Sequence, residues 1–196
     1  MKKTLHELPP AREDHGLPPI HTIGHSTRAI ADFAAMLRAA EVDLLVDIRR
    51  VPRSRRNPQY NLEILPIELV DYGIGHMRIA ELGGLRHASD VPADVNAFWT
   101  NRSFHSYADY ALSESFQEGL ERLLRASVAR RTAIMCAEAV WWRCHRRIVA
   151  DYLINAGRAV FHLMGKSNAQ QASMTGAAVR FGKALSYPGQ VLSSRL

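Results

Sequence analysis

Residues 132–157 read TAIMCAEAVWWRCHRRIVADYLINAG, and this stretch decides the fold class. Its first part (132–138) is a short, mostly apolar run of the kind that forms a buried strand. After a short loop, residues 143–157 carry apolar side chains at helical spacing, and Gly157 stands where a helix C-cap is expected. The stretch therefore predicts a strand that leads directly into a helix.

The same alternation extends along the chain in both directions. Residues 42–49 (VDLLVDIR) are almost continuously apolar, as expected for a strand covered on both faces. Further strands are predicted within PIHTIGHS (19–26), IGHMRIAELGG (74–84) and RAVFHLM (158–164). Strands and helices alternate about five times, which is typical of an α/β fold. We therefore predict a three-layer α/β domain with a mostly parallel sheet of about five strands and helices on both faces.

Domain boundaries follow from changes in composition. Residues 1–19 contain four prolines and no periodic pattern, which predicts a flexible leader. Residues 20–164 are predicted to form the single α/β domain, whose longest helix covers roughly 106–129. From Gly165 onward Gly, Ser, Gln and Ala dominate, so 165–196 is interpreted as a C-terminal tail or as an arm packed on the domain or a partner.

Composition and charge limit the functional class. No apolar run approaches the roughly 18 residues of a membrane helix, and the N-terminus has no apolar stretch typical of a secretory signal. With only two cysteines, we expect a cytoplasmic protein with no membrane partner. The net charge of +6, carried mainly by arginine, favours an anionic partner such as nucleic acid or a nucleotide, although an arginine-rich proteome would give the same balance. The oligomeric state is not indicated.

Polar side chains gather where the predicted strands end. These residues are His25 and Ser26 after the first strand, Asp47 and Arg49 at the end of the second, and Cys136 and Glu138 at the end of the fourth. The carboxyl ends of parallel strands meet at one edge of a sheet, where ligands bind. Alternation along a strand also directs Cys136 and Glu138 to the same side. We therefore predict that these side chains line one cleft.

The helix that follows begins with CHRR (144–147). A helix N-terminus presents unpaired N–H groups and a partial positive charge, so it attracts anions and lowers the pKa of a thiol. Cys144 is therefore a candidate thiolate, and Arg146 or Arg147 is a candidate phosphate ligand. The alternative is that Cys144 is a small buried residue and that His145 packs with the apolar side chains of its helix face.

Two other arrangements of these residues are less consistent with the spacing. Zinc sites usually have roughly two to four residues between paired cysteines, whereas Cys136 and Cys144 are eight positions apart. Adjacent side chains on a helix point about 100° apart, so Cys144 and His145 are not expected to reach one ion. A Cys-x5-Arg phosphate loop starting at Cys136 would need arginine where Trp142 stands, because Arg143 comes one position later. We therefore predict no metal and no cofactor, and no disulfide in a reducing compartment.

The loop RRVPRSRRNPQY (49–60) carries five arginines within residues 49–56 and ends on Tyr60. Arginines bind phosphates and aromatic rings stack on bases, so this composition favours a nucleic-acid surface. Two prolines would stiffen the loop near Arg49. The alternative is an ordinary solvated basic loop.

Several motifs together resemble a known family. The motifs, in chain order, are TIGHS (22–26), LVDIRRVPRSRRNPQYN (45–61), LGG (82–84), YADY (107–110), MCAE (135–138) and CHRRIVADYL (144–153). They resemble the domain of unknown function 488 family over about residues 20–163. The resemblance implies a compact three-layer α/β domain and no established reaction. The signature polar positions that it implies are His25, Ser26, Asp47, Arg49, Ser54, Arg55, Cys136, Glu138, Cys144, His145 and Arg146.

The sequence thus favours an enzyme that acts on a phosphate-bearing substrate, a nucleotide or a nucleic acid. The catalytic residues expected are His25, Cys136, Glu138 and Cys144. The residues expected to bind substrate or phosphate are Ser26, Asp47, Arg49, Ser54, Arg55, His145 and Arg146. The first alternative is a non-catalytic nucleic-acid-binding module, and the second is a metal or redox sensor that uses the two cysteines.

Overall fold

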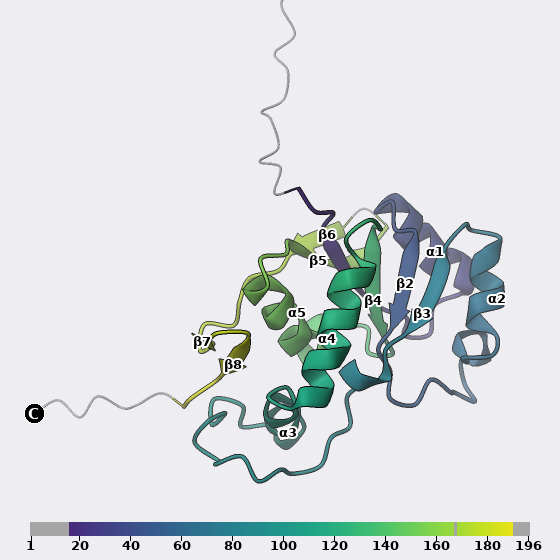
Figure 1. Ribbon diagram of the computed structural model, residues 1–196. Coiled ribbons are helices and arrows are strands. Elements are labelled where there is room, and N and C mark those ends of the chain that lie inside the picture. Colours follow the sequence, from purple (N-terminus) through teal and green to yellow (C-terminus); the bar gives the residue numbers. More distant parts are fainter. Residues whose placement is uncertain (1–15, 167, 190–196) are drawn as a thin grey trace, which may run out of the picture.

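The computed structural model describes residues 16–166 and 168–189, and its centre is a six-stranded sheet (Figure 1). The strands are β1 (Ile20–Gly24), β2 (Leu44–Asp47), β3 (Gly75–Arg78), β4 (Thr132–Cys136), β5 (Val160–Gly165) and β6 (Asn168–Gln171). They lie in the order β3-β2-β4-β1-β5-β6, and every neighbouring pair is parallel except β5 and β6. The mostly parallel α/β sheet predicted from the sequence is confirmed, with one strand more than expected.

Helices cover both faces of this sheet (Figure 1). The helices are α1 (Ile30–Ala39), α2 (Leu65–Val70), α3 (Arg102–Tyr110), α4 (Glu114–Ala126) and α5 (Arg146–Asn155), with short 3-10 turns η1 (Pro58–Tyr60), η2 (Ala80–Leu82) and η3 (Trp141–Arg143). Buried side chains of α1 and α2 form one apolar cluster, and those of α3, α4 and α5 form another. None of the helices in the described ranges is long and apolar enough to cross a membrane.

The central strand β4 separates the two clusters. Ile134 belongs to the cluster of α3, α4 and α5, whereas Ala133 and Met135 belong to the cluster of α1 and α2. All three side chains are fully buried. Because successive side chains of a strand point to opposite faces, a strand covered on both sides needs apolar residues at nearly every position. This explains the continuous apolar runs in the sequence.

The single long helix predicted over residues 106–129 is wrong, because the structure has two helices there. α3 ends at Tyr110, and α4 begins only after Ser113, whose side chain accepts a hydrogen bond from the Phe116 N–H at 3.3 Å. A serine that bonds to the backbone in this way starts a helix rather than continuing one. Val128, expected in the buried stripe of that helix, is 53% exposed because α4 ends at Ala126.

The chain beyond β5 packs on the domain as far as it is described. β6 adds an antiparallel edge strand, and β7 (Val179–Phe181) pairs with β8 (Ala184–Ser186) in a hairpin. Leu185 and Tyr187 are fully buried in the cluster of α5. Within the predicted tail or arm, therefore, the described part is an arm that completes the core. Most of the predicted leader, residues 1–15, lies outside the described residues, as do residues 190–196.

His162 in β5 makes the stability of the fold depend on pH. Its ring is buried against Trp141, at 4.2 Å between ring centroids, and its Nδ1 lies 2.8 Å from the Thr22 hydroxyl. Burial, together with the charge of Arg146, lowers the pKa of His162 to about 4. A histidine in the unfolded chain has a pKa of about 6.5. As the pH falls from about 6.5 to about 4, the unfolded state binds a proton that the native state does not, so stability is lost.

We expect His162 to account for about 2 kcal/mol of the unfolding free energy lost between pH 7 and pH 5. Urea unfolding of the wild type and of His162→Gln at both pH values measures this contribution, because the other histidines titrate in both proteins. The unfolding free energy that His162→Gln loses between the two pH values should be smaller than the wild-type loss by about that amount. Equal losses in the two proteins would show that His162 does not titrate as described.

Candidate active site

A cleft of about 700 Å³ lies at the carboxyl ends of β1, β2 and β4. Open parallel sheets bind their ligands at this place, and the volume suits a ligand of nucleotide size. Most of the site residues predicted from the sequence line it: His25, Ser26, Arg49, Ser54, Cys136, Glu138, Cys144 and His145. Residues from distant parts of the sequence therefore meet at one edge of the sheet.

Three of the predicted residues do not line the cleft. Asp47 is completely buried and binds Arg49. Arg55 is exposed on the loop after β2. Arg146 is 1% exposed, and its guanidinium donates to the backbone carbonyls of Glu138 and Ala139. The Arg146 guanidinium is thus buried and bonded to the protein backbone, so it is not accessible to a phosphate.

The ends of β1 and β4 approach each other closely because of Gly24. A Cβ atom at this position would lie 1.8 Å from the carbonyl oxygen of Glu138. The next residue, His25, donates its backbone N–H to the Cys136 carbonyl at 3.0 Å. Ser26 then takes a φ of 52°, a left-handed conformation that is uncommon for a residue other than glycine. The glycine and this turn together bring His25 and Ser26 beside the Cys136–Glu138 segment.

A buried ion pair between Asp47 and Arg49 lies beside the cleft, and Arg49 is the member that lines it. Arg49 donates from Nε to Asp47 Oδ1 at 2.9 Å and from Nη2 to Asp47 Oδ2 at 2.6 Å. Its Nη2 also donates to the carbonyl of Tyr60 at 2.6 Å, and its Nη1 lies 3.2 Å from His25 Nε2. These contacts fix the guanidinium in one orientation beside the cleft.

His25 completes this network as a neutral ring. Its Nδ1 lies 2.7 Å from the Ser26 carbonyl, and its ring stacks on Tyr60 at 4.1 Å between centroids. A carbonyl only accepts and a guanidinium only donates, so Nδ1 carries the proton and Nε2 accepts from Arg49. Burial, with the nearby charge of Arg49, lowers the pKa of His25 to about 4. His25 therefore orients Arg49, and both of its ring nitrogens are occupied.

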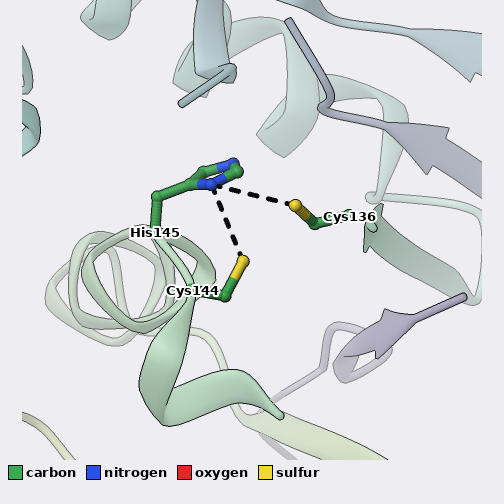
Figure 2. Close-up of side chains that lie close together, drawn as sticks. All are labelled: Cys136, Cys144 and His145. Carbon is green, nitrogen blue, oxygen red and sulfur yellow. Dashed lines mark hydrogen bonds between the residues drawn. The ribbon is translucent and has the colours of Figure 1, made fainter. Parts of the chain in front are cut away.

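Cys136, Cys144 and His145 form the thiol cluster of the cleft. Figure 2 shows the His145 ring directed at both sulfur atoms, with Nδ1 at 3.9 Å from Cys136 Sγ and at 3.6 Å from Cys144 Sγ. Neither cysteine is in a disulfide. The Cβ that Gly84 lacks would lie 2.8 Å from His145 Nδ1, so this glycine of the LGG motif leaves room for the ring.

The expectation that Cys144 and His145 diverge is wrong. It assumes that both residues lie on the helix, but α5 begins at Arg146. Cys144 has an extended backbone, with φ −128° and ψ 147°, and His145 is the residue before the first helical turn. The angle of about 100° between neighbouring helical side chains therefore does not apply, and both side chains turn toward Cys136.

The buried charge of Arg146 favours an anionic sulfur at Cys144. Arg146 makes no ion pair with a carboxylate in the described part of the chain. Its Nε instead donates to Cys144 Sγ at 3.3 Å. A buried guanidinium without a counter-charge is costly, and a thiolate at Cys144 supplies that charge.

The surroundings of the two cysteines shift their pKa values in opposite directions. Burial alone would raise the pKa of the Cys144 thiol. The hydrogen bond from Cys136 and the neighbouring His145 and Arg146 outweigh burial, and they hold that pKa well below its usual value. The same hydrogen bond, with burial, raises the pKa of Cys136 well above the usual value. Of the two cysteines, Cys144 is therefore the one whose surroundings favour the thiolate.

The entrance of the cleft is basic. Arg50 and Arg53 from the loop after β2, and Arg143 from η3, are exposed and line it; we call these three residues the basic rim. Glu138 is the carboxylate among them, and it is exposed as well. Three positive charges around one negative charge favour an anionic ligand.

Sequence reasoning did not assign Arg143 or Tyr107 to the site, and it included Arg50 and Arg53 only as members of a basic loop. A Cys-x5-Arg phosphate loop that starts at Cys136 would place its arginine one position before Arg143, so this motif gives Arg143 no role. In the structure Arg143 nevertheless lines the cleft, and it does so from η3. Tyr107 lines the cleft, donates its hydroxyl to the Leu82 carbonyl at 2.6 Å and packs on His145, at 4.9 Å between ring centroids. Its position in the YADY motif is the signal that could have identified it.

Comparison with known proteins identifies the family of the chain but does not identify a reaction. The family model described as "Domain of unknown function DUF488" matches residues 29–153, a range that includes Asp47, Arg49 and the thiol cluster. Neither the curated proteins nor the solved structures contain a match to the chain. The family match covers more than half of the sequence and agrees with the motifs identified above, so the chain belongs to the DUF488 family.

Proposed function

We propose that the protein is an enzyme that acts on a phosphate-bearing substrate, a nucleotide or a nucleic acid, in the cleft at the strand ends. The observation that carries this proposal is that one cleft contains both the basic rim and the thiol cluster. Arginines alone would indicate anion binding. A thiolate, an imidazole and a carboxylate beside them add groups that take part in chemical steps.

The basic rim supplies the phosphate ligands. The guanidinium groups of Arg53 and Arg143 make no hydrogen bond or ion pair within the described residues, whereas Arg50 already donates to the Leu85 carbonyl at 2.6 Å. Arginine binds phosphate through two parallel N–H groups, which fixes orientation as well as position. Arg53 and Arg143 would therefore hold the phosphate, with the Ser54 hydroxyl nearby in the same cleft.

The reacting groups would be Glu138 and the thiol cluster. Glu138 is exposed to the cleft and can exchange a proton with a bound substrate. The surroundings of Cys144 favour a thiolate, which can bind an electrophilic ion, but its side chain is only 4% exposed and is poorly placed to attack a large substrate. Arg49 and His25, which line the cleft and are held by the buried Asp47, would help to position the substrate.

A non-catalytic nucleic-acid-binding module is the second candidate. Its supporting observation is that Arg55 and Arg56 are exposed on the same loop but outside the cleft, where they would extend a phosphate-binding surface. This candidate requires binding without chemical conversion.

The proposal predicts a salt-sensitive binding site at the basic rim. Fluorescence anisotropy with labelled single-stranded and duplex oligonucleotides, competed with mononucleotides, should show saturable binding that weakens with salt. We expect the double variant Arg53→Ala, Arg143→Ala to bind roughly tenfold or more weakly. The matched control is Arg38→Ala, Arg125→Ala, which removes the same charge from exposed positions on α1 and α4 and should bind nearly as the wild type does.

Conversion of the bound ligand separates the two candidates. The best-bound nucleotides and oligonucleotides are incubated with the protein, and the products are identified by mass spectrometry. An enzyme loses conversion in Glu138→Gln while its binding affinity stays close to that of the wild type. Absence of binding at low salt would rule out both candidates. Binding without any conversion would leave the binding module.

A further inference from the structure

The thiol cluster has the donor set of a zinc site. We propose that Cys136, Cys144 and His145 bind one Zn²⁺ ion through their two sulfur atoms and Nδ1, with the fourth position open to the cleft. This inference deepens the proposed function, because the role of the ion in a reaction rests on the same cleft. The binding of the ion itself can be measured without a substrate.

The distances within the cluster match tetrahedral coordination. Zinc lies about 2.3 Å from sulfur and about 2.0 Å from nitrogen, so a tetrahedral site separates N from S by about 3.6 Å and S from S by about 3.8 Å. His145 Nδ1 lies 3.6 Å from Cys144 Sγ and 3.9 Å from Cys136 Sγ. All three donor atoms lie within 4.8 Å of one another. A shift of at most about 1 Å would complete the geometry.

The orientation of His145 also favours an ion between the donors. A single ring nitrogen faces both sulfur atoms (Figure 2). This nitrogen carries at most one hydrogen, so a hydrogen bond can be well directed to only one of the two sulfurs. A metal ion bound to Nδ1, in contrast, can contact both sulfur atoms at once.

The ligands are held by parts of the fold that restrict their movement. Cys136 is the last residue of the central strand β4, and Cys144 and His145 immediately precede α5. Gly84 packs directly against Nδ1, and a side chain there would displace the ring. Ligands placed in advance in this way reduce the conformational cost of binding an ion.

The two thiolate ligands would offset the charge of the ion itself. The two cysteines bind as thiolates, so any thiol proton is released to solvent, and two negative sulfurs offset the ion's two positive charges. The Nε of Arg146 donates to Cys144 Sγ at 3.3 Å, and this hydrogen bond would orient the sulfur as a metal ligand. Cys144 is only 4% exposed, which hinders attack on a large substrate but not coordination of an ion.

The open position gives the ion a role in the proposed chemistry. Catalytic zinc sites have three protein ligands and leave a fourth position for water or substrate. All three proposed ligands line the cleft. Zinc bound there could polarise a phosphate oxygen held by Arg53 and Arg143, and Glu138 would be the nearby group for proton transfer.

Metal binding by the full-length protein tests this inference. The protein is freed of metal with a chelator and titrated with Zn²⁺ against a chromophoric competitor. We expect one ion per chain, and we expect Cys136→Ser, Cys144→Ser and His145→Gln each to weaken binding about 100-fold or more, since loss of a ligand exceeds loss of a supporting group. Gly84→Ala, which keeps all three ligands but crowds Nδ1, should also weaken it. His162→Gln, at a buried histidine outside the cluster, should not.

Two further measurements exclude an effect of misfolding. Circular dichroism establishes that each variant is folded. Substitution of Co²⁺ for Zn²⁺ should give a sulfur-to-metal charge-transfer band that each cysteine variant weakens, and Zn²⁺ should protect Cys136 from iodoacetamide. Stoichiometric binding that persists in the double variant Cys136→Ser, Cys144→Ser would overturn the inference, as would equal alkylation with and without Zn²⁺. Zinc binding without nucleotide binding would leave this inference intact and remove the proposed function.

Discussion

Replacing Gly24 by alanine should lower the free energy of unfolding by about 3 kcal/mol or more. The added Cβ would lie 1.8 Å from the Glu138 carbonyl oxygen and 2.9 Å from the Ala139 Cα. These atoms belong to the backbone, so no side-chain rotation can relieve the overlap. The end of β4 must move away from β1, which would also displace Cys136 and Glu138 from the cleft.

Urea unfolding of Gly24→Ala measures the loss, and Gly176→Ala is the matched control. A Cβ at Gly176 meets no atom within 4 Å, and the position is exposed. The control should change the unfolding free energy by less than about 0.5 kcal/mol. A value for Gly24→Ala that equals the control would mean that the strand ends do not approach as closely as described.

Replacing Asp47 by asparagine should cost about 3–5 kcal/mol. The Asp47 carboxylate is completely buried and is the counter-charge of Arg49, which is itself only 5% exposed. Asparagine has nearly the same shape, but it leaves the guanidinium buried without an anion. The amide NH₂ group would also face donors that now bind the carboxylate.

Asp43→Asn provides the comparison for this buried pair. Asp43 pairs with Arg130 at 2.8 Å just before the same strand, but both side chains are nearly half exposed. An exposed pair contributes at most about 1 kcal/mol. Chemical unfolding of both variants should therefore show a much larger loss for Asp47→Asn. Similar losses in the two variants would contradict the role assigned to burial.

The parts of the fold that bury apolar side chains could be predicted from the sequence. Strands β2 and β4 could be predicted because consecutive side chains pack alternately into the two apolar clusters, which gives a continuous apolar run in the sequence. Strand β6 (Asn168–Gln171) could not be predicted in this way, because all four of its side chains are exposed and three of them are polar. It is a strand because its backbone pairs with β5, and that pairing leaves no pattern in the side chains.

The site was predictable to the extent that strand ends determine it. Cys136, Glu138 and Arg49 could be placed in one cleft because parallel strands end at the same edge. The role of Arg146 could not be predicted, because sequence spacing does not tell a guanidinium that faces solvent from one that binds backbone carbonyls. The convergence of Cys144 and His145 depends on where α5 begins, and helix boundaries are poorly defined by sequence patterns.

The strand order has a consequence for how the chain folds as it is made. β1 has no sequence neighbour beside it in the sheet: Ile20 lies opposite Thr132 in β4 and opposite Val160 in β5. During synthesis β1 leaves the ribosome long before either partner, so both of its edges stay unpaired. Sheets built from such distant pairs fold slowly, and unpaired apolar strands of a partly made chain are prone to aggregation. An N-terminal fragment that stops before Thr132 would expose apolar edge strands and would contain neither cysteine.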